Sequence, residues 1–328
     1  MITLTITANE SGQRFDKLLA KYLNAAPKSF IYKMLRKKNI TLNGKKAAGN
    51  EILAAGDEVR LFFSDETFAR FHTAASYERA KTKLDILYED DHIVLINKPA
   101  GMLSQRADGR EMSLVEYLIT YLVDSGAVTK EQLATFRPSV CNRLDRNTSG
   151  IVIAGKSLLG LQEMSRMLKE RFVHKYYRCI VRGKMEGTCH LKGYLSKDHA
   201  NNKVTVTDTP EEDSQPIETE YRAIGHAGDL TMLEVLLITG RSHQIRAHLA
   251  SIGHPILGDP KYGDAAVNDL FGRSCKVKYQ LLHAYRLEFP VLTGDFAYLS
   301  ERSFTAPLPQ IYRKVIQYQN KDNNNNPN

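Results

Sequence analysis

The sequence predicts an α+β fold in which a mixed, mainly antiparallel sheet is flanked by helices, behind a small N-terminal ααβ domain. From Leu84 onward, strand-like apolar segments recur, and the helical stretches between them do not alternate strictly with the strands. Residues 1–64 show a different pattern, with two amphipathic helices followed by two short strands. The chain of 328 residues is long enough for these two domains.

The N-terminal domain begins with a helix over residues 14–24, "RFDKLLAKYLN", whose apolar side chains recur at helical spacing until Pro27 ends the run. A second helix, "SFIYKMLRKK", begins with Ser29 as N-cap and turns Phe30, Met34 and Leu35 inward. Its outer face carries four basic side chains, Lys33, Arg36, Lys37 and Lys38.

Two strands complete this domain. The segment "ITLNGKK" enters an Asn43-Gly44 turn, and "DEVRLFF" returns with alternating Val59, Leu61 and Phe63. Residues 65–83 show no sustained periodicity and are interpreted as a linker.

The formal charge of +8 is concentrated in the N-terminal domain. Residues 1–46 hold ten Lys or Arg against two acids, so this segment carries the whole excess, and the other residues are neutral in sum. Such a concentration is typical of an element that binds a polyanion through counterion release. Charge alone is equally consistent with a basic, well-solvated surface.

The second domain is assigned to residues 84–315, and the low-complexity tail 316–328 is expected to be disordered. Two helices are expected, over residues 113–123 and 157–172. The expected strands are "LDILYED", "HIVLINK", "GIVIAG", "YYRCIVRG", "LTMLEVLLI" and "FAYLS".

Several classes of protein are disfavoured by composition. No apolar run approaches the roughly 20 residues that a membrane-spanning helix needs. The N-terminus lacks the basic start and apolar middle of a signal peptide. The four cysteines form no C-x-x-C pair, which favours free thiols in a reducing compartment. We therefore expect a cytoplasmic protein that is not bound to a membrane.

Residues 143–157, "RLDRNTSGIVIAGKS", contain a formal phosphate-loop pattern, "GIVIAGKS". A phosphate loop follows a strand, but here the stiff β-branched residues between the glycines indicate the strand itself. A nucleotide-hydrolysing enzyme is thus the weakest of the functions considered. Asp145 lies just upstream between two arginines, which would keep a carboxylate ionised and fit to act as nucleophile or base. A capping or surface role is the alternative.

A second polar cluster lies in residues 237–263, "LITGRSHQIRAHLASIGHPILGDPKYG". We expect Ser242 to cap a helix with Ile245, Leu249 and Ile252 buried, which leaves Arg246 and His248 off the core face. The histidines do not have the spacing of zinc ligands on a helix, so no metal site is predicted.

A third segment, "VHKYYRCIV", places Tyr177 at the start of a strand. Such a tyrosine either belongs to the core or offers an aromatic face to an unstacked base.

Together, "NRLDRNTSG", "KYY", residues 237–263 and "LHAYRLEFP" resemble the RluA-type pseudouridine synthases, and "INKPAGMLS" (96–104) resembles the start of their catalytic domain. The resemblance covers residues 84–300 and rests on several long motifs in order. The N-terminal domain resembles the S-four type of RNA-binding domain that precedes many of these enzymes.

The resemblance implies a pseudouridine synthase fold and the isomerisation of uridine to pseudouridine in RNA without metal or organic cofactor. It implies that Asp145 is the catalytic carboxylate, which attacks the sugar, attacks the base or removes a sugar proton. Tyr177 would stack on the flipped uracil, Arg246 would pair with the carboxylate, and Arg143 would help to hold the nucleotide outside the helix.

The resemblance also suggests the partner. Large-subunit ribosomal RNA is the expected substrate, transfer RNA is the alternative, and the protein is expected to be a monomer. Besides Arg143, the residues expected to bind RNA are Arg241, Lys33, Arg36, Lys37 and Lys38.

One position departs from the family pattern, because Asn142 stands where the family usually has His before the arginine of this motif. Asn forms hydrogen bonds but does not titrate near neutrality. A second hypothesis is therefore an RNA-binding or ribosome-assembly protein with altered catalysis.

Overall fold

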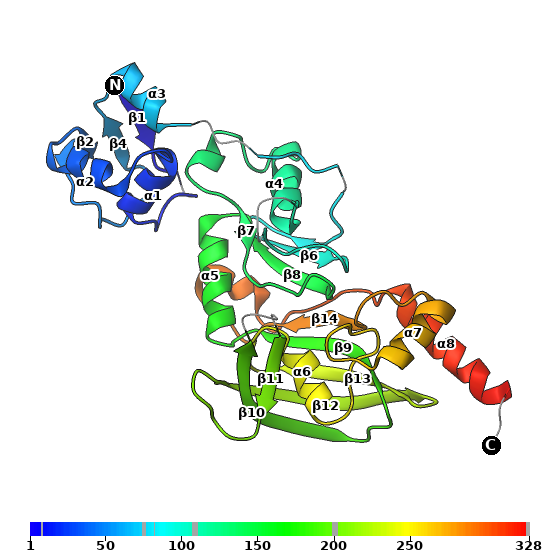
Figure 1. The fold of residues 1–328 in the computed structure, drawn as a ribbon. Helices are drawn as coiled ribbons and strands as arrows, with labels where there is room; N and C mark the ends of the chain where they lie inside the picture. The colour runs from blue at the N-terminus through cyan, green and yellow to red at the C-terminus, as the bar shows by residue number, and fades with distance from the viewer. Residues whose placement is uncertain (8, 74–76, 82, 107–110, 199–202, 326–328) are drawn as a thin grey trace. The chain divides into compact units, whose positions relative to one another are not determined.

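The computed structural model describes residues 1–7, 9–73, 77–81, 83–106, 111–198 and 203–325 (Figure 1). The chain forms two compact units. The first contains residues 1–95, 105–142 and 153–166, and the second contains residues 96–104, 143–152 and 167–328. The predicted domain 84–315 is therefore divided between the two units.

The N-terminal part of the first unit is built on a four-stranded antiparallel sheet in the order β1-β4-β2-β3. Its strands are β1 (Ile2–Thr5), β2 (Ile40–Leu42), β3 (Lys45–Lys46) and β4 (Glu58–Leu61). Helices α1 (Phe15–Tyr22) and α2 (Lys28–Arg36) bury Phe15, Leu18 and Leu35 in one core with Val59 of the sheet. Full burial of one such side chain contributes roughly 1.5–3 kcal/mol.

The hairpin between β2 and β3 turns at Asn43 and Gly44, whose φ values are 51° and 70°. Asn and Gly tolerate this left-handed backbone, which matches the twist of a two-residue hairpin. The predicted hairpin is therefore confirmed, whereas strand β1 was missed.

Two other expectations for this region were wrong. Helix α2 begins at Lys28 behind Pro27, so Ser29 lies inside the helix and is not its N-cap. The interpreted linker contains helix α3 (Asp65–Phe71), in which the Ser64 hydroxyl accepts a hydrogen bond from the Thr67 N–H. Phe68 and Phe71 pack against the N-terminal core, so this helix belongs to that core.

The rest of the first unit includes α4 (Leu114–Asp124), the short 3-10 helix η1 (Gln132–Ala134) and α5 (Leu158–Lys169) as far as Arg166. Ser113 and Glu116 form a capping box that fixes the start of α4. The strands are β5 (Ile86–Glu89) and β7 (Ser139–Val140), together with parts of β6 (Ile93–Lys98) and β8 (Ser149–Gly155). Strands β6 and β8 each run from one unit into the other.

Every residue of β8 is buried, which confirms that "GIVIAG" is a strand. Its glycines permit close packing: a side chain at Gly150 would stand 2.2 Å from the Ala284 carbonyl oxygen. This segment is therefore not a phosphate-binding loop.

The sheet of the second unit follows the order β11-β10-β12-β13-β9-β14-β8. All neighbours in this order are antiparallel except β14 and β8, which are parallel. The α+β prediction with a mixed, mainly antiparallel sheet is confirmed. The remaining strands are β9 (His174–Arg182), β10 (Thr188–Asp198), β11 (Lys203–Thr207), β12 (Gln215–Ala227), β13 (Leu230–Leu237), β14 (Leu282–Glu288) and β15 (Ser303–Thr305).

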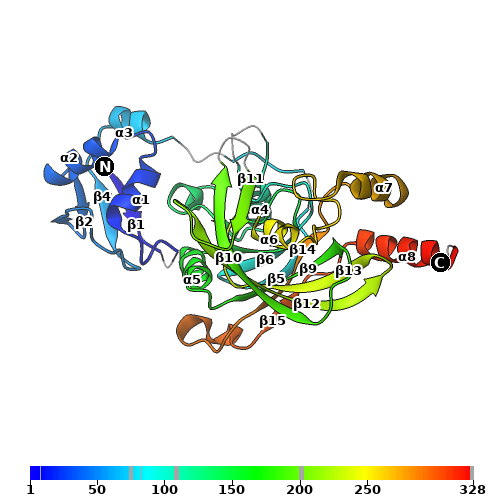
Figure 2. The same ribbon diagram turned by 60° about the horizontal axis from the view of Figure 1, so that its bottom comes forward.

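Helix α6 (Gln244–Ser251) lies against β11 and β12, and α7 (Ala265–Cys275) contacts α8 (Gln310–Asn325) (Figure 1, Figure 2). Two predictions for this unit differ from the structure. "FAYLS" lies in a 3-10 helix, η2 (Gly294–Leu299), in which Phe296 and Leu299 are buried. The tail expected to be disordered from residue 316 continues α8 to Asn325, with Val315 in the core, and residues 326–328 lie outside the described part. No helix in the described ranges is long and apolar enough to span a membrane.

Candidate active site

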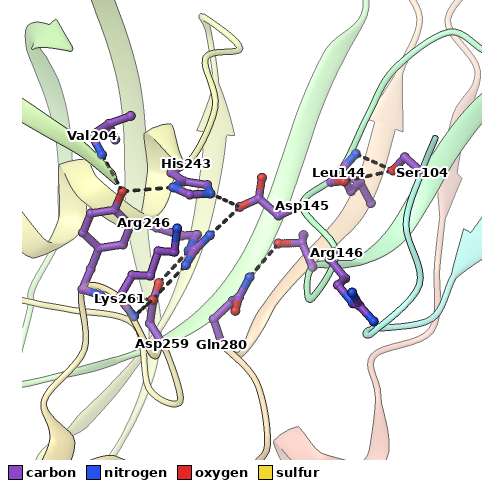
Figure 3. Close-up of polar contacts among 12 residues, drawn as sticks. Ser104, Leu144, Asp145, Arg146, Val204, His243, Arg246, Asp259, Lys261 and Gln280 are labelled. Atoms are coloured by element: carbon purple, nitrogen blue, oxygen red, sulfur yellow. Dashed lines mark hydrogen bonds and ion pairs between the residues drawn. The ribbon is translucent and has the colours of Figure 1, made fainter. Parts of the chain in front are cut away.

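Asp145 lies in the loop that leads into β8, and the residues on both sides of it are fixed by hydrogen bonds. The Ser104 hydroxyl donates to the Leu144 carbonyl at 2.9 Å and accepts from the Leu144 N–H at 3.0 Å (Figure 3). The Gly101 N–H donates to the Arg146 carbonyl at 2.9 Å. The segment after β6 therefore holds the backbone of the Asp145 loop in place.

Lys98, at the end of β6, is a further residue of this support that the sequence analysis did not single out. Its side chain is fully buried, and Nζ donates to the carbonyls of Pro99, Met102 and Arg146 at 3.0, 2.8 and 3.1 Å. Burial lowers the pKa of the Lys98 ammonium to about 7, although the negative charge of Asp145 opposes this shift. The sequence does contain a signal for this residue, because Lys98 ends an apolar strand within the motif "INKPAGMLS".

Arg246 of α6 connects two carboxylates. Its Nη1 donates to Asp145 Oδ2 at 2.7 Å, while Nε and Nη2 donate to the two oxygens of Asp259 at 2.7 and 2.9 Å (Figure 3). Burial alone would lower the pKa of the Arg246 guanidinium, but Asp259 and Asp145 together raise it. The fork-like contact with Asp259 fixes the plane of the guanidinium and directs one N–H at Asp145.

The prediction that Arg246 and His248 lie off the core face was wrong, because their exposed fractions are only 4% and 2%. Asp259 neutralises Arg246, and the His248 Nδ1 lies 3.0 Å from the Thr219 hydroxyl. These polar partners allow both side chains to be buried. Ile252, expected in the core, is instead 38% exposed.

His243 precedes α6 in a left-handed backbone conformation, with φ of 55°, and takes the N-cap position expected for Ser242. Its Nε2 lies 3.9 Å from Asp145 Oδ2, and its Nδ1 lies 3.0 Å from the Tyr262 hydroxyl (Figure 3). That hydroxyl accepts a hydrogen bond from the Val204 N–H of β11. Burial lowers the pKa of His243, Asp145 opposes this shift, and Arg246 and Lys261 add to it.

Tyr177 lies on β9 and is 6% exposed. Burial and the negative charge of Asp145 both raise the pKa of its phenol, so Tyr177 is neutral at physiological pH. The second unit thus brings together Asp145, Arg246 and Tyr177, three side chains that are far apart in the sequence.

Comparison with known proteins assigns this arrangement to a family. The family model for RNA pseudouridylate synthase matches residues 92–251. Ribosomal large subunit pseudouridine synthase C of Vibrio vulnificus is 32% identical to the chain, over 95% of the chain and 94% of that protein. The chain belongs to the RNA pseudouridylate synthase family. It is therefore an isomerase that acts on RNA.

Other relatives agree with this assignment. The synthase is 33% identical to the Escherichia coli protein of the same name, over 87% of its own chain and 88% of that protein. It is 30% identical to an uncharacterised RNA pseudouridine synthase of Mycoplasma genitalium, over 95% and 96% of the two chains.

Two solved human structures share the fold at low identity. Human RNA pseudouridylate synthase domain containing 4 aligns with a TM-score of 0.57 and 21% identity, over 72% of this chain and 93% of that chain. Human RNA pseudouridylate synthase domain containing 1 aligns with a TM-score of 0.51 and 23% identity, over 71% and 94%.

The other expected site residues of the synthase are exposed. Arg143 lies in the Asp145 loop, and Arg241 precedes α6. The four cations Lys33, Arg36, Lys37 and Lys38 lie on the outer face and C-terminal end of α2, in the first unit. Within the described ranges, no group of three or more His, Cys, Asp or Glu side chains is arranged to hold a metal ion.

Asn142 has a structural contact. Its Oδ1 accepts a hydrogen bond at 2.8 Å from the Ile153 N–H of β8. This contact needs an acceptor and no titration, and an amide supplies the acceptor.

Proposed function

We propose that this synthase converts specific uridines of large-subunit ribosomal RNA to pseudouridine, with Asp145 as the catalytic carboxylate. The observation that carries the proposal is the hydrogen bond from Arg246 to Asp145, made by a guanidinium that Asp259 holds in a fixed plane.

The reaction breaks the bond from ribose to the uracil nitrogen, turns the base and joins it again through a ring carbon. A carboxylate is needed that stays in one position while the base moves. The Asp145 side chain is 27% exposed, so it is accessible to a nucleotide, and its loop is held from Leu144 and Arg146. These contacts position the carboxylate before substrate binds.

Tyr177 is proposed to stack on the extruded uracil. Its ring is neutral and close enough to Asp145 for the carboxylate to raise its pKa. A flat apolar face beside the reacting group offsets part of the few kcal/mol that base extrusion costs. Arg143, exposed in the Asp145 loop, is proposed to hold the nucleotide outside the helix.

The ribosomal target is proposed from two observations. The relatives of Vibrio vulnificus and Escherichia coli carry names that specify the ribosomal large subunit. The N-terminal domain also presents exposed cations on α2, which suit contact with a large folded RNA. We propose that this domain binds the same RNA.

The alternative of an inactive RNA-binding protein rested on Asn142. The structure gives Asn142 a backbone partner in β8, and Asp145, Arg246 and Tyr177 are all present. These features favour an active enzyme.

The test maps pseudouridines across total RNA from cells with and without the gene, by carbodiimide-based sequencing. We expect one or a few sites in large-subunit RNA to disappear, and to return with wild type but not with Asp145→Asn. Asp145→Asn keeps the side-chain volume, and its RNA binding should match wild type. Restoration of the sites by Asp145→Asn would refute the role of Asp145, and loss of transfer RNA sites alone would refute the target.

A further inference from the structure

Lys175 lies on the same face of β9 as Tyr177. Side chains two residues apart on a strand point to the same side, about 6.6 Å apart along it. Lys175 therefore lies one step from the proposed uracil-stacking ring, toward the start of the strand.

Lys175 carries a positive charge that the protein does not compensate. The side chain is half-buried, and among the residues that the structure describes no carboxylate forms an ion pair with Lys175, Arg171 or Arg241. Burial lowers the pKa of the Lys175 ammonium, and the positive charge of nearby Arg171 lowers it further. Two neighbouring cations without an acid are stabilised by an anion from outside the protein.

The ammonium also lies beside the segment that leads into α6. A Cβ placed on Gly240 would stand 3.4 Å from Lys175 Nζ. Gly240 has no side chain to occupy this space, and Arg241 follows it directly. The Lys175 ammonium thus lies against the segment that carries Arg241. Beyond the chain neighbours of Gly240, no other side chain of the described residues comes within 4 Å of the position that its Cβ would take.

We propose that Lys175, supported by Arg171 and Arg241, binds a backbone phosphate of the RNA next to the extruded uridine. The inference rests on the proposed function, because it uses Tyr177 as the position of the uracil. A base over Tyr177 places the phosphates of its own nucleotide within reach of the next side chain on that face. A phosphate supplies the missing negative charge and accepts hydrogen bonds from ammonium and guanidinium groups.

The first experiment measures kcat and KM of the full-length protein on a large-subunit RNA transcript at several salt concentrations. Lys175→Met should raise KM about tenfold or more, as expected for the loss of a hydrogen bond to a charged group. It should also reduce the slope of log KM against log salt by about 0.7, the value for one phosphate contact on single-stranded RNA. Lys175→Arg keeps the charge and should stay near wild type in both quantities.

The matched control is Lys192→Met, which removes one charge from an exposed lysine of β10 in the same unit. It should leave KM and its salt slope near wild type. An unchanged KM for Lys175→Met, or an equal effect of Lys192→Met, overturns the proposal.

A second experiment is a double-mutant cycle that tests whether Lys175 contacts one particular phosphate. RNA fragments carry a single uncharged methylphosphonate at one of the linkages flanking the modified uridine. Neutralising the bound phosphate should weaken RNA binding by wild type and by Lys175→Arg. It should not weaken RNA binding by Lys175→Met any further, because this variant already lacks the contact. Additive losses at every flanking linkage overturn the proposal. If Lys175→Met does not fold, Lys175→Gln, which also removes the charge but keeps a polar side chain, takes its place in both experiments.

These outcomes separate the two proposals. If wild type forms no pseudouridine in the transcript, the proposed function fails. The salt slope of RNA binding by wild type, Lys175→Met and Lys175→Arg then still tests the phosphate contact without turnover.

Discussion

Positive charge is used in two different ways in the two units. On α2 of the first unit, Lys33, Arg36, Lys37 and Lys38 are exposed, and no carboxylate in the described part of the chain forms an ion pair with them. In the second unit, Arg246 is 4% exposed and bonded to two carboxylates. The first arrangement attracts a distant polyanion, whereas the second holds one acid in a fixed geometry.

The exposed cations of α2 and the buried Arg246 should therefore respond differently to mutation. An exposed cation is already solvated, so its removal leaves the fold nearly unchanged. A buried cation neutralises buried acids, so its removal leaves those acids without a partner. The most severe structural effect is therefore expected at Arg246.

Arg246→Ala should destabilise the second unit by about 3–5 kcal/mol, the usual effect of removing one partner of a buried ion pair. Asp259 is the cause, because its side chain is fully buried and loses its ion pair with Arg246 together with the two hydrogen bonds from that guanidinium. Its carboxylate keeps the hydrogen bonds from the backbone N–H groups of Lys261 and Tyr262. Urea denaturation measures the change, and Arg36→Ala on α2 is the control, expected to lie within about 0.5 kcal/mol of wild type. Equal stability of the two variants would show that the contrast between the regions is wrong.

The basic face of α2 could be predicted from local sequence patterns, whereas the burial of the residues around Asp145 could not. The basic face of α2 follows from helical periodicity and a count of charges, both of which are local properties. The proposed roles of Asp145, Tyr177 and Arg246 come from motif resemblance. In the second unit Arg246 donates a hydrogen bond to Asp145, and Asp145 is close enough to Tyr177 to raise its pKa. Periodicity nevertheless placed Arg246 and His248 off the core, because it cannot show that Asp259 and Thr219 provide partners for buried polar groups.

Other errors have the same origin. Helix α3 has no long periodic pattern, and it is stabilised by packing of Phe68 and Phe71 on a core formed by other segments. Lys98 lies in a quoted motif, but its role depends on carbonyls that include the distant Arg146. Such contacts are tertiary and are not encoded in local spacing.

Lys98 is a third kind of cation, because it is buried and its hydrogen-bond partners are carbonyls instead of carboxylates. Lys98→Met should destabilise the protein by about 1–3 kcal/mol, since the carbonyls of Pro99 and Met102 lose the donor Lys98. The Arg146 carbonyl also loses Lys98 but keeps the Gly101 N–H. It should also lower kcat more than KM, because the loop that carries Asp145 is less firmly held. Single-turnover kinetics measures the effect on the chemical step, and a parallel RNA-binding measurement shows whether affinity also changes.

The same residue gives a pH dependence with a definite sign. The pKa of Lys98 is about 7 in the folded protein and 10.5 ordinarily, so between these values the unfolded chain holds one more proton. The free energy of unfolding contributed by Lys98 should therefore rise with pH from about 7 to 10.5 and be constant outside that window. Urea titrations of wild type and Lys98→Met at several pH values measure it, and a constant difference between them would refute the shifted pKa.

The smallest effect on folding and turnover is expected on α2. Changing Lys33, Arg36, Lys37 and Lys38 together to Gln should leave kcat near wild type, since the exposed side chains support no other structure. RNA binding should weaken, and its salt slope should flatten by about 3 if all four side chains contact phosphates. The matched control changes four exposed lysines of the second unit to Gln, namely Lys184, Lys192, Lys197 and Lys314. Because both variants lose four positive charges, a flatter slope for the α2 variant alone assigns the RNA contact to α2, and equal slopes would mean that only the net charge of the protein matters.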